Sequence, residues 1–539
     1  MRTECLPFTL IPHTTPLFTD LLYNYPKVQQ FFPHSPDLAQ WAKEEAGLIR
    51  YESGRRRNVA AILERQNRAW GASPETLKNL ERLRAGACCM VTGQQVGLFG
   101  GPLYAIFKAL GAIRLAEKAT ELGADCVPVF WLATEDHDLA EINHTRLLAG
   151  DGSLQPVATS TRGAPDAPVS EIRLGEEIRE ALENAETALG DSEIAGLLRR
   201  CYQPGETLGS AFARLFSALA GRWGVLMLDA SDPELHALAQ PIYRAAIERA
   251  EELDQALLER DRELLSSGYH DQVKVTELST LLFTIQNGSR VVIQRANGVA
   301  RAADFRIDEE KISREKLLER IDAEPQHFSA NVLLRPVVQD YLLPTLAYTG
   351  GPAECAYFAQ AAVVYEKLLG RVTPAVPRFS ATLLEPKAAS LLERYSLTLT
   401  DVFEGPERVR EALAERALPA DLKAAFEAAE KALDQNLARI VTSLEHLDPT
   451  LVDAAQNAGS KMHYQLDRLQ GKAARAELLR NEVLDRHASL LSNLLFPHKE
   501  LQEREIAGVS FLARHGMDLL ERLYQAANGS CPDHQVVYL

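Results

Sequence analysis

Two short apolar runs flank a helical repeat between residues 88 and 132. Cys88–Val91 is the first run, and a turn rich in glycine and glutamine follows it. From Leu103 onward, apolar residues recur three or four positions apart, as on one face of a helix. Val127–Leu132 is the second run. The order strand, turn, helix, strand predicts a βαβ unit with two parallel strands.

Polar turns follow both apolar runs. The first turn contains Thr92, Gly93, Gln94, Gln95 and Gly101, and the second contains Glu135, Asp136, His137 and Asp138. Ligands of open parallel sheets bind outside the carboxyl ends of the strands. The two turns are therefore predicted to face one cleft.

The same strand–turn–helix pattern returns further along the chain. The segment 342–349 leads into Gly350-Gly351-Pro352, and 353–369 has helical spacing. Glu354 falls in the first turn of that helix, where the helix dipole favours a carboxylate. Apolar runs at 224–230 and 372–377 predict further strands. Together these segments predict an α/β core built on a Rossmann-like parallel sheet.

Two inserts interrupt this core, at about 145–210 and 270–335. The first is rich in loops, with Asp151-Gly152 as a hairpin signal. In the second, runs at 281–285 and 291–294 around Asn287-Gly288 predict a hairpin. We expect the charged segment 306–321 to be helical and 331–335 to be extended. Before this insert, one long helix is expected over about 234–266.

From about residue 385 the composition shifts to Ala, Leu, Glu, Lys and Arg. Apolar residues step by threes and fours over 422–447 and again over 451–476, and Asp448-Pro449 separates the two series. This pattern predicts an antiparallel coiled-coil hairpin whose apolar stripe joins two chains into a homodimer. The predicted domains are the core at 1–385, the coiled coil at 386–495 and a helical tail at 496–539 that packs back on the core.

Composition and charge argue against several classes of function. The formal charge of −16 argues against nucleic acid as the main partner, because no basic excess offsets phosphate repulsion. No apolar run reaches the roughly 18 residues of a membrane span, and the N-terminus lacks a signal-peptide pattern. The seven cysteines are scattered without C-x-x-C spacing, which favours a reducing cytoplasm.

The spacing of residues in the glycine turn and in the turn at 135–138 is compatible with more than one chemistry. Neither a G-x-G-x-x-G fingerprint nor a Walker A loop is present. The glycine turn either holds an anion through free N–H groups or is purely structural. The segment 135–138, with Glu141 and His144, is a solvated loop, a metal site or a substrate-holding acid–base turn. His137 and His144 lack a standard zinc spacing, so no metal is predicted.

Several blocks of the sequence resemble the bacillithiol biosynthesis cysteine-adding enzymes. They are spread over about residues 90–525 and are long enough to be specific. The blocks are Val91-Thr92-Gly93-Gln94-Gln95-x-Gly97-Leu98-Phe99-x-Gly101-Pro102-Leu103-Tyr104, Pro128-Val129-Phe130-Trp131, Glu135-Asp136-His137-Asp138, Glu141-Ile142-Asn143-His144, Gly350-Gly351-Pro352-x-Glu354 with Tyr357 and Gln360, Pro377-Arg378, and Leu501-Gln502-Glu503-Arg504 with Phe511-Leu512 and Gly516.

This resemblance implies a cytoplasmic ligase that joins L-cysteine to the amine of glucosaminyl-malate and so completes bacillithiol. It also implies a core similar to class I aminoacyl-tRNA synthetases and a coiled-coil dimer. The candidate catalytic residues are Asp136, His137, Glu135 and Asp138. The candidate substrate-binding residues are Thr92, Gly93, Gln94, Gln95, Gly101, Tyr104, Asn143, His144, Gly351, Glu354, Tyr357 and Gln360. For a nucleotide the candidates are Arg504, Arg514 and His515, with a charged helix face as the alternative.

The sequence departs from that of the class I synthetases in the motifs that bind ATP. The chain lacks the His-x-Gly-His and Lys-Met-Ser-Lys-Ser signatures with which class I synthetases bind ATP. Because an amide forms in water only from an activated acyl group, we still expect ATP to be consumed, with ADP or AMP as product. The alternatives are a coiled-coil scaffold that binds a sugar or nucleotide without catalysis, and a nucleotide-sugar glycosyltransferase.

Overall fold

The computed structural model describes residues 2–296, 304–529 and 531–539. The chain forms two compact units. The first unit comprises Met1–Thr382 and Glu503–Val537, and the second comprises Leu383–Gln502 and Tyr538–Leu539. Residues 297–303 of the second predicted insert lie outside the described residues.

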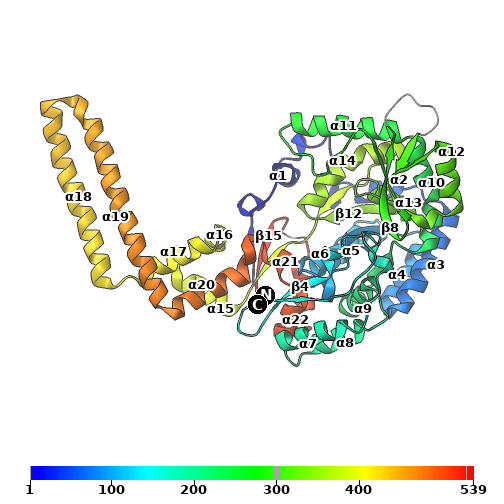
Figure 1. The fold of residues 1–539 in the computed structure, drawn as a ribbon, viewed down its shortest axis with the longest axis horizontal. Coiled ribbons are helices and arrows are strands. Elements are labelled where there is room, and N and C mark those ends of the chain that lie inside the picture. Colours follow the sequence, from blue (N-terminus) through cyan, green and yellow to red (C-terminus); the bar gives the residue numbers. More distant parts are fainter. Residues whose placement is uncertain (1, 297–303, 530) are drawn as a thin grey trace. The chain divides into compact units, whose positions relative to one another are not determined.

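A five-stranded parallel sheet forms the centre of the first unit (Figure 1). Its strands in spatial order are β13 (Ala375–Pro377), β12 (Thr345–Gly350), β2 (Cys88–Gln94), β3 (Cys126–Leu132) and β6 (Leu226–Asp229). Neighbouring strands all pair in parallel. The short runs are apolar at nearly every position because both faces of such a sheet are covered. The predicted Rossmann-like core is confirmed.

The strand order reverses at β2. From β2 the chain proceeds outward to β3 and β6, and later strands β12 and β13 are added on the other side of β2. The carboxyl ends of β2 and β12 therefore flank a topological switch point. In open α/β sheets this crevice is where ligands bind.

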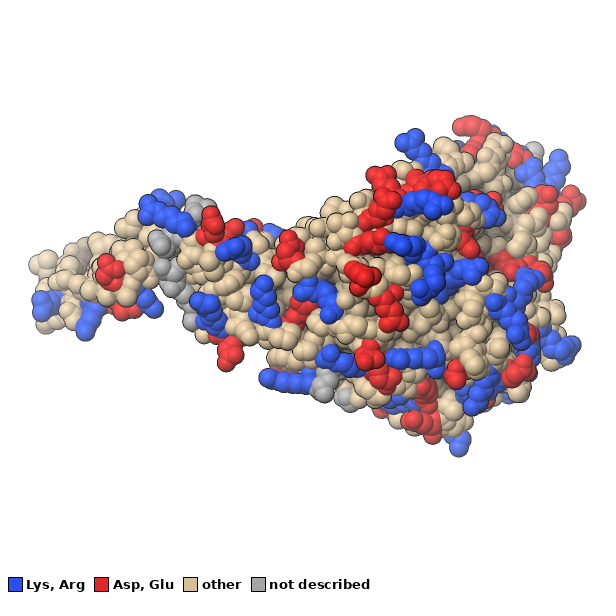
Figure 2. All heavy atoms as spheres, turned by 90° about the horizontal axis from the view of Figure 1, so that it is seen from below, with Lys and Arg blue, Asp and Glu red and all other residues tan. Residues whose placement is uncertain are grey.

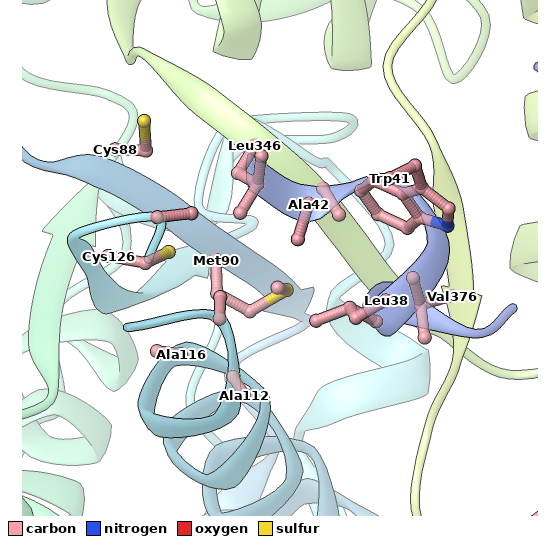
Figure 3. Close-up of a cluster of buried hydrophobic side chains, with 13 residues drawn as sticks. Leu38, Trp41, Ala42, Cys88, Met90, Ala112, Ala116, Cys126, Leu346 and Val376 are labelled. Atoms are coloured by element: carbon pink, nitrogen blue, oxygen red, sulfur yellow. The ribbon is translucent and has the colours of Figure 1, made fainter. Parts of the chain in front are cut away.

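Helices cover the sheet on both faces (Figure 1). Beneath α5 (Tyr104–Glu121), Met90 of β2 packs against Ala112 and Ala116, and all three side chains are buried (Figure 3). The two alanines let the helix approach the strand closely, and burying a methionine contributes about 2 kcal/mol. The other helices of at least seven residues before the second unit are α1 (Pro16–Tyr23), α2 (Ala42–Leu48), α3 (Ser53–Ala69), α4 (Pro74–Ala85), α7 (Ile178–Leu189), α8 (Glu193–Cys201), α9 (Leu208–Ala220), α10 (Pro233–Glu248), α11 (Ala250–Ser266), α12 (Arg314–Ala323), α13 (Arg335–Leu342) and α14 (Pro352–Leu369).

Both predicted hairpins are present in the inserts. In the first insert, β4 (His144–Leu148) pairs with β5 (Leu154–Ala158) around Asp151-Gly152. In the second, β7 (Ser279–Gln286) pairs with β8 (Ser289–Arg295). Asn287 and Gly288 have φ of 52° and 80°, the left-handed values that a tight hairpin turn requires. The second sheet has the order β10-β9-β8-β7-β11.

Three predictions in this region were wrong. The segment 306–321 begins with strands β9 (Phe305–Ile307) and β10 (Glu310–Ile312), whose apolar residues are buried, and becomes helical only in α12. The extended residues lie earlier than expected, in β11 (Phe328–Ala330). The long helix is two helices, α10 and α11, because Arg249 leaves the helical region with φ of −111° and ψ of 18°.

The second unit contains the predicted coiled coil. Helices α18 (Ala420–Leu447) and α19 (Val452–Arg480) run side by side as a hairpin (Figure 1). The first helix ends at Leu447, because Asp448 has the extended backbone angles φ −160° and ψ 105°. The Asp448 carboxylate caps the turn that follows, where it accepts hydrogen bonds from the N–H and hydroxyl of Thr450. The remaining helices of this unit are α15 (Pro386–Tyr395), α16 (Leu399–Phe403), α17 (Pro406–Ala417) and α20 (Glu482–Leu495).

The C-terminal residues of the first unit begin at Glu503, within α21 (Gln502–Glu505), and continue through α22 (Gly508–His515) and α23 (Leu519–Ala526). They end in β15 (His534–Tyr538), a strand that the sequence analysis missed, and β15 pairs antiparallel with β1 (Thr3–Leu6). Cys5 and Cys531 form a disulfide beside this pair, whereas the scattered cysteines had favoured a reducing cytoplasm. The other five cysteines are free and buried.

Charge is mixed on one face of the molecule. On the face shown in Figure 2, basic and acidic side chains are interspersed, so that face carries no extended basic patch. Within the described residues, none of the helices has the length and apolar character needed to cross a membrane. The same residues contain no cluster of His, Cys, Asp and Glu side chains arranged to hold a metal ion.

Candidate functional site

A cavity of about 290 Å³ lies at the switch point, and we call it the switch-point cavity. It is formed by the end of β2 and the turn after it, the end of β3, the end of β12 with the start of α14, and side chains from α5, α13 and α21. Its lining residues are Gly93, Gln94, Gln95, Tyr104, Lys108, Trp131, Ala133, Val332, Arg335, Tyr348, Gly351, Pro352, Ala353, Glu354, Tyr357, Arg378 and Arg504.

Lys108 and Glu354 form a buried ion pair in the wall of this cavity. The Lys108 ammonium donates to the Gly93 carbonyl at 2.7 Å, to Gln94 Oε1 at 2.8 Å and to Glu354 Oε1 at 2.9 Å. Glu354 also accepts from the Tyr348 hydroxyl at 2.6 Å and from the Gly351 N–H at 2.7 Å. The pair thus ties α5 to the turn that starts α14.

The two partners have shifted pKa values. Burial lowers the pKa of Lys108, and the Glu354 carboxylate opposes that shift only in part. Burial alone would raise the pKa of Glu354, but Lys108, the Tyr348 hydroxyl and the Gly351 N–H outweigh it and lower that pKa. Glu354 is therefore held as a carboxylate.

The cavity carries an excess of positive charge. Its lining contains four basic side chains, Lys108, Arg335, Arg378 and Arg504, against the single carboxylate of Glu354. Arg335 donates to the Tyr357 hydroxyl at 2.8 Å and to Gln339 Oε1 at 3.2 Å, which are both neutral groups. The buried indole N–H of Trp131, also in the lining, has no hydrogen-bond partner among the described residues. A guanidinium group can donate two parallel hydrogen bonds to a carboxylate, and the indole N–H of Trp131 can donate one more. These groups therefore suit a carboxylate-bearing ligand.

Arg378 is fixed from behind by a buried network. Its guanidinium donates to Glu503 Oε1 at 2.5 Å, and Glu503 Oε2 accepts from the Ser380 hydroxyl and the Ala381 N–H, both at 3.0 Å. His534 lies beside them, with Nδ1 2.8 Å from the Ser380 hydroxyl. Burial lowers the pKa of His534 to about 4, although Glu503 opposes the shift.

The His534 environment predicts a loss of stability in mild acid. An unfolded histidine binds a proton near pH 6.5, whereas folded His534 stays neutral down to about pH 4. Between these values the unfolded state binds more protons, so the free energy of unfolding should fall by up to about 3 kcal/mol as pH is lowered. Urea unfolding of wild type and His534→Gln at several pH values measures this. The variant should be less stable at pH 7.5 but should lose less stability on acidification, and parallel pH profiles would contradict the assignment.

Gln95 connects the two polar turns. Its amide donates to Asp136 Oδ2 at 3.1 Å and to Glu141 Oε2 at 2.7 Å. On the other side of the turn, Arg290 Nη1 lies 3.5 Å from Asp136 Oδ1 and 3.3 Å from His137 Nδ1. Asp136 and His137 therefore lie between the glycine turn and the second insert.

Other predicted site residues lie outside the switch-point cavity. Asp138 Oδ1 caps the short helix α6 (Leu139–Ile142) by accepting from the Glu141 N–H, and His144 Nδ1 is 3.0 Å from the Ala140 carbonyl. Asn143 accepts from the Thr159 N–H through its backbone carbonyl. The Thr92 hydroxyl donates to the Thr349 carbonyl between neighbouring strands. Gln360 is fully buried and donates to Asp261 and to the Val273 carbonyl.

The glycine turn and the basic residues of the tail were the other predicted ligand-binding groups. The N–H groups of Gly97, Gly100 and Gly101 donate to carbonyls within the turn, so the turn does not offer them to an anion. The basic residues of the tail are also separated: Arg504 lines the switch-point cavity, whereas Arg514 donates to the Ala149 carbonyl in the first insert at 3.0 Å. His515 is the last residue of α22 and is absent from the cavity lining.

Comparison with known proteins identifies the family. Residues 1–379 match the family description "Bacillithiol biosynthesis BshC, N-terminal Rossmann-like domain". Residues 381–539 match "Bacillithiol biosynthesis BshC, C-terminal coiled-coil domain". The chain belongs to the BshC family. The resemblance drawn from the sequence blocks is thereby confirmed.

Relatives in the BshC family match this chain over nearly its whole length. A protein from Koribacter versatilis is 49% identical over 540 residues, with complete coverage of both chains. One from Solibacter usitatus is 36% identical, also with complete coverage, and one from Salinibacter ruber is 32% identical over 97% of this chain and 96% of its own. Each is named "Putative cysteine ligase BshC".

Proposed function

We propose that this protein is a ligase that joins L-cysteine to the glucosamine amine of glucosaminyl-malate. The observation that carries the proposal is the cationic switch-point cavity, in which four basic side chains outnumber the carboxylate of Glu354 and that of Glu503 behind Arg378. The malate part of this substrate has two carboxylates, and they complement Arg335 and its basic neighbours. The names of the relatives support a cysteine ligase over a scaffold or a glycosyltransferase.

The reaction forms a C–N bond between the cysteine carboxyl carbon and the sugar amine. We propose that ATP activates the carboxylate first, so that the amine displaces a phosphate or AMP group as the C–O bond breaks. The amine also loses a proton, and Asp136 or His137, in the turn beside the cavity, is the proposed recipient. Arg504 is the proposed nucleotide contact in the switch-point cavity.

The direct test is an incubation of the pure protein with glucosaminyl-malate, L-cysteine and ATP, followed by mass spectrometry. We expect an ATP-dependent amide product together with ADP or AMP, which also reports the activation route. Binding of substrate without product would favour the scaffold. Release of a nucleoside diphosphate from a uridine nucleotide-sugar, without any requirement for cysteine, would favour the glycosyltransferase.

The coiled coil is the proposed dimer interface. Several large apolar side chains on α18 and α19 are exposed in the single chain, among them Ile440, Met462 and Leu469. Light scattering of the purified protein should give twice the chain mass of 59.6 kDa. A variant with Ile440, Met462 and Leu469 changed to glutamate should give the monomer mass, and an unchanged dimer would place the interface elsewhere.

A further inference from the structure

The hydroxyl of Tyr104 belongs to the lining of the switch-point cavity, and a chain of hydrogen bonds fixes its orientation. The chain starts at Lys108. Because the Lys108 ammonium only donates, the Gln94 amide turns its oxygen toward the ammonium, at 2.8 Å. The amide nitrogen of Gln94 therefore faces Tyr104, and Nε2 lies 2.9 Å from the Tyr104 hydroxyl oxygen.

This arrangement leaves the hydrogen of the Tyr104 hydroxyl unused. An amide nitrogen carries hydrogens and no available lone pair, so Gln94 donates and the Tyr104 oxygen accepts. The O–H of Tyr104 therefore points away from Gln94. Within the part of the chain that the structure describes, no group accepts a hydrogen bond from it. Tyr104 thus offers the cavity a donor whose direction is fixed in advance.

Three cationic groups surround the Tyr104 ring. The guanidinium carbons of Arg378 and Arg504 lie 5.3 and 5.9 Å from the ring centroid, and the Lys108 ammonium nitrogen lies 5.6 Å from it. Burial raises the pKa of Tyr104, while Arg504 and Arg378 oppose that shift. The hydroxyl therefore keeps its proton at neutral pH and is a neutral donor in a positive environment.

Such a donor suits an oxygen that gains negative charge during a reaction. Hydrogen bonds placed in advance stabilise that oxygen more in the transition state than in the ground state. The malate carboxylates are charged throughout, and Arg335 and the Trp131 N–H already suit them. The acyl oxygen of an activated cysteine is neutral before the amine attacks and negative afterwards. Tyr104 also lies beside Arg504, the proposed nucleotide contact.

We propose that the Tyr104 hydroxyl donates a hydrogen bond to the acyl oxygen of the activated cysteine, and that Gln94 positions the hydroxyl for this role. The inference rests on the proposed function. When the amine nitrogen attacks the acyl carbon, a C–N bond forms and an electron pair of the C=O bond moves onto the oxygen. The pair returns as the C–O bond to the phosphate or AMP group breaks, and that group leaves with the bonding electrons. Tyr104 keeps its proton throughout, and the proton of the amine passes to Asp136 or His137.

Tyr104→Phe removes the hydroxyl and keeps the ring among its three cations. We expect kcat for amide formation to fall about 100- to 1,000-fold, the usual effect of losing one such donor. The control is Tyr25→Phe, which removes the hydroxyl of another half-buried tyrosine, one that donates to the Phe32 carbonyl. It should leave kcat within about twofold of wild type. Wild-type kcat in Tyr104→Phe would overturn the inference.

Two substitutions of Gln94 separate the orientation of the hydroxyl from packing. Gln94→Glu places a carboxylate oxygen where the amide nitrogen lies, so the Tyr104 hydroxyl should donate to it instead of to the acyl oxygen. Gln94→Met removes the amide and leaves the hydroxyl free to donate. We expect kcat to fall at least about 30-fold in Gln94→Glu but less than about tenfold in Gln94→Met. Equal losses in the two variants would overturn the positioning role of Gln94.

Calorimetric titration with glucosaminyl-malate alone distinguishes the acyl oxygen from the malate carboxylates, because no cysteine is present. The affinity of Tyr104→Phe should stay within about threefold of wild type, since the hydroxyl has no role until the acyl group is attacked. A loss of about tenfold or more would place the hydroxyl on a malate carboxylate and overturn the inference.

The outcomes also separate this inference from the proposed function. If the wild-type protein forms the amide and Tyr104→Phe forms it equally fast, the proposed function stands and the role of Tyr104 is lost. If the wild-type protein forms no amide, the proposed function is lost and the role of Tyr104 with it.

Discussion

Replacing Glu503 with alanine is expected to destabilise the first unit by about 3–5 kcal/mol. Glu503 is only 1% exposed and holds the guanidinium of Arg378 at 2.5 Å. The substitution leaves the Arg378 charge buried without its counterion, and it also removes the acceptor of the Ser380 hydroxyl and the Ala381 N–H. Removing one partner of a buried pair costs more than the pair itself contributes, because the other charge stays desolvated.

Urea unfolding followed by tryptophan fluorescence isolates this effect. All four tryptophans, at positions 41, 70, 131 and 223, belong to the first unit, so the signal reports on that unit alone. The matched control is Glu176→Ala, which removes a carboxylate from an exposed pair with Arg179 and should change stability by less than about 1 kcal/mol. Equal effects of the two substitutions would contradict the buried-pair argument.

A double variant distinguishes stability from function. Replacing both Arg378 and Glu503 with methionine removes both charges together, and such replacements are often close to neutral in stability. We expect this variant to recover most of the stability lost in Glu503→Ala but to remain impaired as an enzyme, because Arg378 lines the switch-point cavity. Full activity in the double variant would show that Arg378 serves the fold alone.

The parallel core was predictable because its signals are local. The runs that became β2 and β3 are apolar at nearly every position, and a polar turn follows each of them. The Asn287-Gly288 pair identified its hairpin for the same reason, since two adjacent residues with positive φ determine the turn. In contrast, β9 and β10 have three residues each, too few for an alternating pattern to stand out among charged neighbours.

The candidate site was only partly predictable because its contacts are distant in sequence. Lys108 pairs with Glu354, 246 positions away, and Arg378 pairs with Glu503, 125 positions away. The one local signal was a lysine among the apolar residues of α5, and the sequence analysis did not use it. Arg335, Trp131 and Tyr348 had no distinguishing local pattern. The strand β15 was missed because its partner, β1, lies at the opposite end of the chain.

Replacing Arg335 with methionine is expected to lower kcat/KM for glucosaminyl-malate by about 30- to 1,000-fold, the range that corresponds to 2–4 kcal/mol. The hydrogen-bond partners of Arg335 are the neutral Tyr357 and Gln339, so its charge is available to a substrate carboxylate. Methionine keeps much of the length and apolar contact of arginine but removes the N–H donors of the guanidinium group. Because the malate carboxylates do not react, the loss should appear mainly in KM, with kcat changed much less.

The control for this variant is Arg260→Met. Arg260 is also largely buried, with a side chain 10% exposed, but it pairs with Glu263 on α11 and is absent from the lining of the switch-point cavity. It should cost stability while leaving KM within about twofold of wild type. Arg335→Lys tests geometry, since a lysine restores the charge without the two parallel donors and should recover only part of the loss. If Arg335→Met bound glucosaminyl-malate as tightly as wild type, the dicarboxylate would have to bind elsewhere, and the assignment of the switch-point cavity to this substrate would be wrong.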